Sequence, residues 1–367
     1  MGVHWLIVAV LGLHGVIHLL GFAKAFGLAS LPQLTQPIAR PVGIAWLAAG
    51  VLVLASAALF AGGHRRFWWV GAIAVVVSQA VLATAWRDAW AGTLANVLLA
   101  TVVAHAWLTE GPWSFRAQML RDAGPALAAR ANAPIVTEAD LAGLPIPVAR
   151  YLRAAGVVGQ PRVRSYALRF RGRIRSDPAS PWLPFTAEQV SVVDPPVRLF
   201  LMRARMHGLP VEAFHRSVGG HATMQVRVAG VVPMVDARGD VMDRSEVVTM
   251  FNDMSLLAPG ALLSPAIAWE AVDDRTVRAR FTNGQTIAAT LHFGDDGFLT
   301  DFVSDDRSRL SSDNTRFTPQ RFSTPVHGFQ RFGPAATATV GEGRWHGPEG
   351  PFTYGEFHVV DLVLNQR

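Results

Sequence analysis

The sequence predicts two parts: a membrane bundle of four α-helical spans, and an α+β soluble domain. The soluble domain is expected to be a curved antiparallel sheet or open β-barrel with a helix across its concave face. Residues 1–110 carry five basic and two acidic side chains, whereas residues 111–367 carry 28 basic and 25 acidic. The first part holds four apolar stretches that approach the roughly 20 residues a helix needs to cross a bilayer. From residue 164 onward, short alternating runs are separated by turn residues, which is typical of strands.

The four expected spans contain no charged side chain and are bounded by polar residues, Gly or Pro. Tryptophans lie mostly near their ends, where an amphipathic indole suits the headgroup zone of a bilayer. A cleavable signal peptide is the alternative for the first span, but this span lacks a basic n-region and a small-residue cleavage site. The spans are Val3 to Leu20, Val42 to Ala61, Phe67 to Trp86 and Ala91 to Leu108.

Loop charges predict the orientation in the membrane, because short cytoplasmic loops are enriched in Lys and Arg. Four spans put both ends of the chain on one side. With a cytoplasmic N-terminus, the inside segments hold Arg65, Arg66, Arg116 and Arg121, against Lys24, Arg40 and Arg87 outside. This small excess predicts a multi-pass protein of the bacterial inner membrane with a cytoplasmic C-terminal domain. The chain has no cysteine, which suits either redox compartment.

A helical connector is expected over residues 111–163, followed by a β-domain over residues 164–367 with about ten to twelve strands. A helical insert is expected near residues 243–258. Asp243-Arg244-Ser245-Glu246 has the spacing of a capping box with Asp243 as the N-cap, and Pro259-Gly260 would end the helix. Turns such as Asn283-Gly284 join the later strands. The polar segment Asp305 to Thr315 is expected to be a long hairpin tip or a mobile loop.

A strongly curved sheet with a helix across it can enclose an apolar cavity. The order of elements resembles the bacterial lipoprotein-carrier fold, an incomplete barrel lidded by helices that holds acyl chains. Ordinary core packing is the alternative for each apolar residue on the concave face or under the helix. The candidate ligand-binding residues are Phe170, Trp182, Phe185, Phe200, Met202, Met224, Phe251 and Leu257, with Leu256 and Leu262 beside them.

Four segments resemble those of an uncharacterised bacterial family. Its members carry the same soluble domain, some of them behind a similar helical region. The segments are Leu13 to Phe22, Pro181 to Gln189, Val232 to Gly239 and Gly350 to Tyr354. The resemblance implies the two-part architecture over most of the chain. It implies no activity and no catalytic residue, because the family has no assigned function.

Arginines provide most of the net charge of +6, and no basic run interleaved with stacking aromatics is found, so nucleic acid is excluded as a partner. Arg169, Arg171, Arg173 and Arg175 alternate with other residues and are expected to share one face of a strand. They would either pair with acidic residues on the next strand or attract anionic lipid headgroups at the membrane surface.

No motif fixes a reaction. The chain has no Gly-x-Ser-x-Gly elbow, no phosphate-binding Gly loop, no His-Glu-x-x-His and no cysteine ligand set. His215 and His221 flank a Gly-Gly turn, and Glu188 and Asp236 are available as carboxylates, so a metal site or an acid/base pair could be drawn from them. The sequence therefore assigns no catalytic residue, no cofactor and no protein partner.

Histidines inside the expected spans form a second group of candidate site residues. His14 and His18 are four residues apart and face the same side of one helix, and His105 lies in the fourth span. Neutral imidazoles bind metals and haem iron, and a helical bundle can present them. The alternative is that they cross-link the helices by hydrogen bonds with Gln79 and Asn96, each contributing on the order of 1 kcal/mol.

Two functions follow as hypotheses. In the first, the β-domain binds a lipid or another hydrophobic ligand next to the bilayer that holds it, as a carrier, a sensor or an envelope-assembly factor. In the second, the helical bundle carries haem or a metal through His14, His18 and His105, and the β-domain acts as a sensor or interaction module. Retained lipid would support the first, and a Soret band the second.

Overall fold

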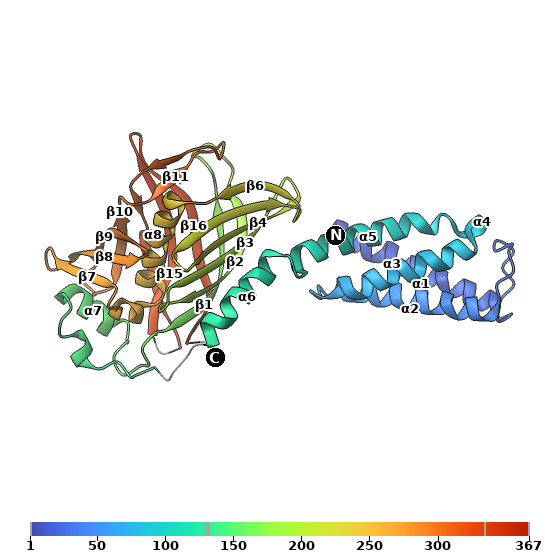
Figure 1. Ribbon diagram of the computed structural model, residues 1–367, viewed down its shortest axis with the longest axis horizontal. Helices are drawn as coiled ribbons and strands as arrows, with labels where there is room; N and C mark the ends of the chain where they lie inside the picture. Colours follow the sequence, from blue (N-terminus) through green and yellow to red (C-terminus); the bar gives the residue numbers. More distant parts are fainter. Residues whose placement is uncertain (1, 129–132, 334, 366–367) are drawn as a thin grey trace. The chain divides into compact units, whose positions relative to one another are not determined.

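The computed structural model describes residues 2–128, 133–333 and 335–365. The chain divides into two compact units, with the boundary between Ala117 and Gln118 (Figure 1). This boundary lies inside a helix, seven residues beyond the end that the sequence suggested for the membrane region at residue 110.

The first unit is helical. Its helices are α1 (Val3–Ala25), α2 (Arg40–Ala61), α3 (Phe67–Thr84), the short α4 (Trp86–Ala89) and α5 (Gly92–Glu110). Four helical segments are long and apolar enough to cross a membrane: α1, α2, α3 and the segment Gly92–Ala128 that contains α5. The four apolar helices expected from the sequence are therefore confirmed, and the first continues past Leu20 to Ala25.

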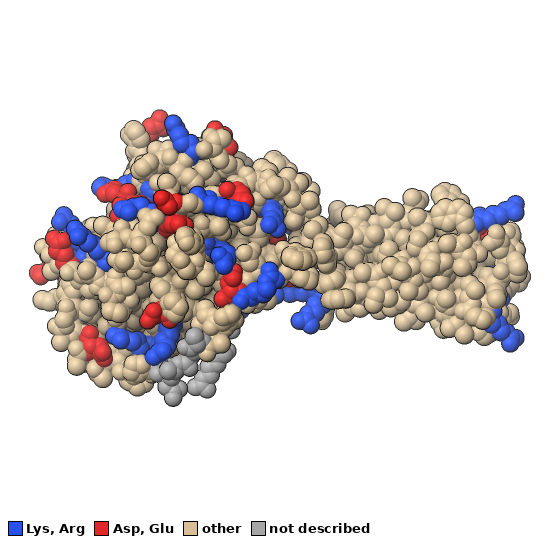
Figure 2. Space-filling model, in the orientation of Figure 1, with Lys and Arg blue, Asp and Glu red and all other residues tan. Residues whose placement is uncertain are grey.

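Apolar side chains cover the outside of this unit. Val3, Leu6 and Val76 are 74%, 66% and 68% exposed, and an apolar surface of this kind is compatible with insertion in a membrane. On the face shown in Figure 2, charged side chains are scattered over the β-rich unit, whereas those of the helical unit lie at its two ends and leave the middle free of charge. Within the bundle, small residues allow close packing: a Cβ at Gly21 of α1 would overlap the indole of Trp46 in α2.

The second unit is built on strands. Its helical segments are α6 (Phe115–Ala128), which crosses the unit boundary, the 3₁₀ helix η1 (Glu138–Leu141), α7 (Ile146–Ala154), α8 (Asp240–Leu257) and the 3₁₀ helix η2 (Pro259–Leu263). Its first strands are β1 (Ser165–Ile174), β2 (Leu183–Val192), β3 (Val197–Met206), β4 (Leu209–Val218), β5 (His221–Val228) and β6 (Val232–Ala237). The later strands are β7 (Ile267–Ala271), β8 (Thr276–Asn283), β9 (Gln285–Phe293), β10 (Leu299–Ser304), β11 (Ser308–Leu310), β12 (Phe317–Pro319), β13 (Phe322–Ser323), β14 (Val326–Phe332), β15 (Ala335–Gly347) and β16 (Gly350–Leu364).

One antiparallel sheet contains all of these strands except β11 and β12, which pair with each other. Its order is β6-β5-β4-β3-β2-β1-β16-β15-β13-β10-β9-β8-β7, with β14 paired to β15. Two meanders, β1–β6 and β7–β10, therefore form the wings of the sheet, and the C-terminal strands lie between them. The sheet is curled around α8 (Figure 1), which confirms the expected curved sheet with a helix on its concave face.

The start of α8 differs from the capping-box prediction. The helix begins at Asp240, and its N-cap is Gly239 with a φ of 90°, a conformation that glycine adopts without strain. Asp243 lies inside the first turn, and its carboxylate accepts a hydrogen bond from the amide of Ala222 at 2.6 Å. Glu246 points away from the N-cap. Both carboxylates have partners on the sheet, and these tertiary contacts override the local capping pattern.

The polar segment Asp305 to Thr315 was expected to be a long hairpin tip or a mobile loop, and the structure shows the hairpin. The segment contains β11 and most of the turn that leads to β12, and a hydrogen bond from the amide of Ser308 to the hydroxyl of Ser245 at 3.2 Å holds it to α8. β14 was not expected from the sequence, whose last strands were predicted at about residues 316–322, 336–346 and 352–364. Its burial pattern shows mostly exposed residues, so it lacks the strong alternation that identifies strands by sequence.

Candidate functional site

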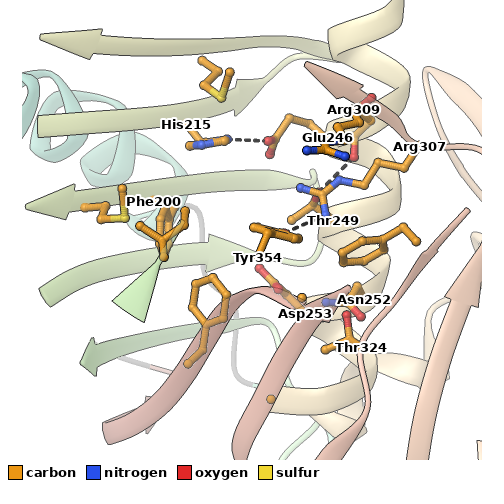
Figure 3. A pocket seen from close by; sticks show the side chains of 18 of the residues that line it. Phe200, His215, Glu246, Thr249, Asn252, Asp253, Arg307, Arg309, Thr324 and Tyr354 are labelled. Atoms are coloured by element: carbon orange, nitrogen blue, oxygen red, sulfur yellow. Dashed lines mark hydrogen bonds and ion pairs between the residues drawn. The ribbon is translucent and has the colours of Figure 1, made fainter. Parts of the chain in front are cut away.

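A cavity of about 350 Å³ lies between α8 and the concave face of the sheet (Figure 3). This volume is within the range of roughly 300–1,000 Å³ that small-molecule sites occupy. Apolar side chains predominate on the wall contributed by β1, β3, β5 and β16 and at the end of α8. The large apolar side chains of the cavity include Phe170, Phe200, Met202, Met224, Leu256, Leu257, Phe357 and Val359.

The sheet places cavity-lining side chains in a row across four strands. Gln189 on β2, Phe200 on β3, His215 on β4 and Met224 on β5 are successive cross-strand neighbours. Side chains alternate between the two faces of a strand, so residues in register point to the same face. Arg198 lies two positions before Phe200 on β3 and points to this face as well.

α8 has a polar side and an apolar side. Glu246, Thr249, Asn252 and Asp253 recur at helical spacing and line the cavity. On the apolar side, Phe251 is fully buried and stacks on Phe281 of β8, with ring centroids 5.3 Å apart. The helix thus separates a solid core, packed against β8–β10, from the cavity, which is bounded by β1–β5 and β15–β16.

A buried charge network joins the helix to the sheet. Arg198 Nε donates to Asp253 Oδ2 at 2.6 Å, and its Nη1 donates to Glu246 Oε2 at 3.0 Å. Gln189 Nε2 donates to the same Asp253 oxygen at 2.8 Å. His215 Nδ1 lies 2.7 Å from Glu246 Oε1. The side chains of Arg198 and Glu246 are only 6% and 1% exposed.

The network keeps Glu246 ionised. Burial would raise the pKa of Glu246, but the charges of Arg198 and His215 outweigh burial and lower that pKa to about 2. An ionised carboxylate only accepts hydrogen bonds, so His215 must carry a proton on Nδ1. Burial likewise would lower the pKa of Arg198, yet Asp253 and Glu246 raise it. At neutral pH Glu246 is therefore a paired carboxylate and not a proton donor.

A family model, described as a family of unknown function, matches residues 134–357, more than half of the chain. The chain belongs to the DUF6544 family. The match extends past η1 to Phe357 within β16, and so includes α8 and all the cavity-lining residues except Val359. It confirms the resemblance to an uncharacterised family that the sequence segments indicated. No protein of curated function matches the chain.

Several solved structures match this DUF6544 chain at low sequence identity. A DUF1329 family protein from Desulfovibrio piger is 11% identical and covers 63% of this chain and 94% of its own, with a TM-score of 0.35. A putative outer membrane lipoprotein-sorting protein domain from Vibrio parahaemolyticus is 10% identical, covers 60% and 91%, and has a TM-score of 0.30. A LolA superfamily protein from Nitrosomonas europaea is 11% identical, covers 59% and 93%, and has a TM-score of 0.28. We take neither a ligand nor a role from these likenesses.

The candidate ligand-binding residues divide between the cavity of the DUF6544 domain and its surroundings. Those that line the cavity are Phe170, Phe200, Met202, Met224, Leu256 and Leu257. Phe185 is buried behind the cavity wall against Phe357, and Phe251 faces the solid core. Leu262 is buried in η2, and Trp182 lies in the β1–β2 loop beneath the guanidinium groups of Arg173 and Arg175.

The four alternating arginines do not share one face. Arg169, Arg171 and Arg173 are exposed on the convex side of β1, where Arg169 pairs with Asp361 at 2.9 Å and Arg173 with Glu356 at 2.6 Å, both on β16. This is the expected pairing with acidic residues of a neighbouring strand. Arg175 lies past the end of β1 and lines the cavity, because strand alternation stops at Ile174.

The histidines and carboxylates considered for a metal or acid/base site have separate partners. His215 contacts Glu246, and His221 lies 3.5 Å from Asp243. Asp236 pairs with Arg238. Glu188 pairs with Arg203. Among the residues that the structure describes, no group of three or more His, Cys, Asp or Glu side chains could hold a metal ion.

The membrane-helix histidines belong to a hydrogen-bonded cluster. His18 Nε2 lies 2.8 Å from Ser78 Oγ, and His14 Nε2 lies 3.1 Å from Asn96 Oδ1. Ser78 also donates to Asn96 Oδ1 at 2.8 Å. The cluster borders a cavity of about 390 Å³ in the bundle, which His105 does not line. Cross-linking of helices accounts for these contacts, and a haem or metal role for His14, His18 and His105 stays a prediction.

Sequence reasoning missed the polar half of the site. Arg198 is flanked by Val197 and Leu199 in a strand whose first five residues are all buried, and a charge in such a run indicates an internal partner. Glu246, Thr249 and Asp253 recur at helical spacing beside the apolar residues of α8. These two signals together could have predicted a buried ion pair between the strand and the helix.

Proposed function

We propose that the second unit binds a lipid or another hydrophobic ligand in the cavity, and that the apolar helices of the first unit hold it next to a membrane. The observation that carries the proposal is the apolar wall of the cavity, where Phe170, Phe200, Met202 and Leu257 surround a space of about 350 Å³. Protein interiors are close-packed and contain few voids larger than a water molecule. The apolar side chains of this wall lack packing partners on the cavity side, and a bound apolar chain would supply them.

The buried network supports a binding role over a catalytic one. Both Glu246 oxygens accept hydrogen bonds, and the carboxylate of Asp253 accepts from two donors. Fully paired charges of this kind fix the position of α8 against β2, β3 and β4. They hold the cavity open by preventing the helix from collapsing onto the opposite wall. Binding of an apolar ligand needs this rigidity and no free acid or base.

The proposal is tested by purifying the full chain, extracting the lipid that it retains and identifying that lipid by mass spectrometry. The comparison is among the wild type, Phe200→Arg in the cavity and Val363→Arg on the surface, where Val363 is 46% exposed. We expect the wild type and Val363→Arg to retain the same lipid species by mass spectrometry, and Phe200→Arg to lose it. Lipid around the membrane helices is the same in all three, so the difference reports on the cavity. Equal retention in all three would contradict the proposal.

A further inference from the structure

A second group of arginines lines the cavity and, among the described residues, forms no ion pair with a carboxylate. Arg307 and Arg309 flank Ser308 at the start of β11, two positions apart, so they lie on the same side of the strand. Arg175 follows the end of β1. Arg309 Nη2 donates to the carbonyl oxygen of Ser176 at 3.0 Å, and this contact joins the two segments.

The three guanidinium groups rest on aromatic rings. Arg307 lies 4.2 Å from the ring centroid of Phe322 and donates to the hydroxyl of Tyr354 at 3.2 Å. Arg175 and Arg309 lie 5.1 Å and 5.3 Å from the same ring, that of Phe352. The ring of Phe352 thus contacts both guanidinium groups. Cation–π contacts and neutral oxygens orient the guanidinium groups without neutralising them.

The balance of charge in the cavity is positive. Four arginines line it, at positions 175, 198, 307 and 309, against two carboxylates, Glu246 and Asp253. Both carboxylates bind Arg198, and the charge of Arg307 also helps to lower the pKa of Glu246 without forming an ion pair with it. Across residues 2–128, 133–333 and 335–365, no ion pair involves Arg175, Arg307 or Arg309. Like charges that line one cavity repel each other, so a site that holds three arginines without an ion pair is suited to a counter-ion.

The remaining donors fit an anion. A guanidinium group has five N–H donors in a planar fork that matches carboxylate and phosphate oxygens. In the described contacts Arg307 and Arg309 each use one donor, and Arg175 uses two, on the carbonyl oxygens of Thr353 and Pro178. Most of their donors are therefore free to bind oxygens of a ligand.

We propose that Arg175, Arg307 and Arg309 bind the anionic head group of an amphipathic ligand, a carboxylate or a phosphate, whose apolar chain occupies the wall formed by Phe170, Phe200 and Met202. This inference rests on the proposed function and specifies its ligand class. The arginines and the apolar wall line one cavity, so a single molecule can contact both. Neutral lipids and free hydrocarbons would leave the positive charge uncompensated.

Three probes with the same chain length test the inference: dodecanoate, dodecyl phosphate and the uncharged dodecanol. Binding to the full chain in phosphatidylcholine nanodiscs is measured by titration calorimetry at neutral pH, with empty nanodiscs as the background. We expect the wild type to bind the anions on the order of 10- to 100-fold more tightly than dodecanol, the ratio that charge-assisted hydrogen bonds provide. The preference between the two anions identifies the head group as a carboxylate or a phosphate.

The decisive variant is Arg307→Gln with Arg309→Gln. Its matched control is Arg169→Gln with Arg173→Gln, which removes the same charge from the convex face of β1. We expect the first pair to bind the anions no more tightly than dodecanol, and the second pair to behave as the wild type. Circular dichroism verifies folding of each variant. Lysine at positions 307 and 309 should restore part of the preference for anions.

The outcomes separate the two proposals. If the wild type binds dodecanol as tightly as the anions, or if the double variant Arg307→Gln with Arg309→Gln keeps the preference for anions, the head-group assignment is wrong and the hydrophobic site stands. If the wild type binds none of the three probes above the background, the hydrophobic site itself is wrong.

Discussion

Arg198 is the residue on which the site depends most. Its guanidinium is buried between two carboxylates that belong to different turns of α8. Bringing three charges out of water costs several kcal/mol per ion, and only their close pairing offsets this cost. Removing one member leaves the others uncompensated, and such losses amount to about 3–5 kcal/mol. The network therefore acts as a rigid joint between β3 and α8.

The low pKa of Glu246 predicts loss of stability in acid. This pKa falls from its ordinary 4.5 to about 2 on folding. A carboxylate whose pKa is lowered by folding contributes its full stabilisation above its unfolded pKa and loses it as the pH falls toward the folded value. We expect the free energy of unfolding to decrease by on the order of 3 kcal/mol between about pH 4.5 and pH 2.

Thermal unfolding of the full chain in detergent from pH 7 to pH 2 measures this loss. The matched variant is Glu246→Gln, which is less stable than the wild type at pH 7 and should lose less stability over the same acid range. An identical acid response in the wild type and the variant would show that other carboxylates cause the loss.

At the scale of elements, one side of α8 packs in the core and the other side lines the cavity. Phe251 belongs to the solid core with Phe281 and Phe302, whereas Thr249 faces the cavity. We expect Phe251→Ala to lower stability by about 3–5 kcal/mol, the usual cost of removing a buried aromatic ring, and to leave lipid retention intact. Thr249→Phe should fold normally and lose most of the retained lipid, because its ring occupies the cavity.

Unfolding temperature and extracted lipid, measured on the same preparations, distinguish the two variants. A Thr249→Phe protein that keeps its lipid would place the ligand elsewhere. A Phe251→Ala protein that loses lipid while it is still folded would show that the core side of the helix also shapes the cavity.

α8 also shows which features of an element could be predicted from the sequence and which could not. Its apolar spacing and the Pro259-Gly260 stop predicted the element and its end, since both are local signals. Its start was predicted three residues too late, because Asp243 and Glu246 bind Ala222, Arg198 and His215 instead of capping the helix. In β3, alternation predicted that Phe200 and Met202 face inward. The same rule places Arg198 inward, but only the fold shows which charges it meets.

At the scale of the whole molecule, hydropathy predicted the helical unit well, because each span is a local property of about 20 residues. The strand pairing at the centre of the sheet could not be predicted from the sequence. β1 pairs with β16, so that Tyr166 lies opposite Leu364, and no local pattern specifies a partner almost 200 residues away. The Arg307 and Arg309 site was missed for a related reason, since β11 is three residues long and depends on β12 and α8 for its position.

The loop charges predict that the β-rich unit faces the cytoplasm. The chain has no cysteine, so single cysteines can be labelled without background. We expect Glu349→Cys, in the exposed β15–β16 turn, to resist a membrane-impermeant maleimide in spheroplasts and to react after lysis. Ser30→Cys, between α1 and α2, should react in intact spheroplasts. The reverse pattern would place the unit outside the cytoplasm, with the same four helices in the opposite orientation.

The central position of β16 has a consequence for biosynthesis. The strand links the β1–β6 wing to the strands that lead through β15 to the β7 wing. A ribosome has translated both wings before it reaches residues 350–364. Until those residues emerge, the two wings have no shared strand and the apolar cavity wall has no second side. Folding of this unit must therefore be completed after translation of β16, and a premature stop codon within this strand would release a chain whose two wings lack the strand that connects them in one sheet.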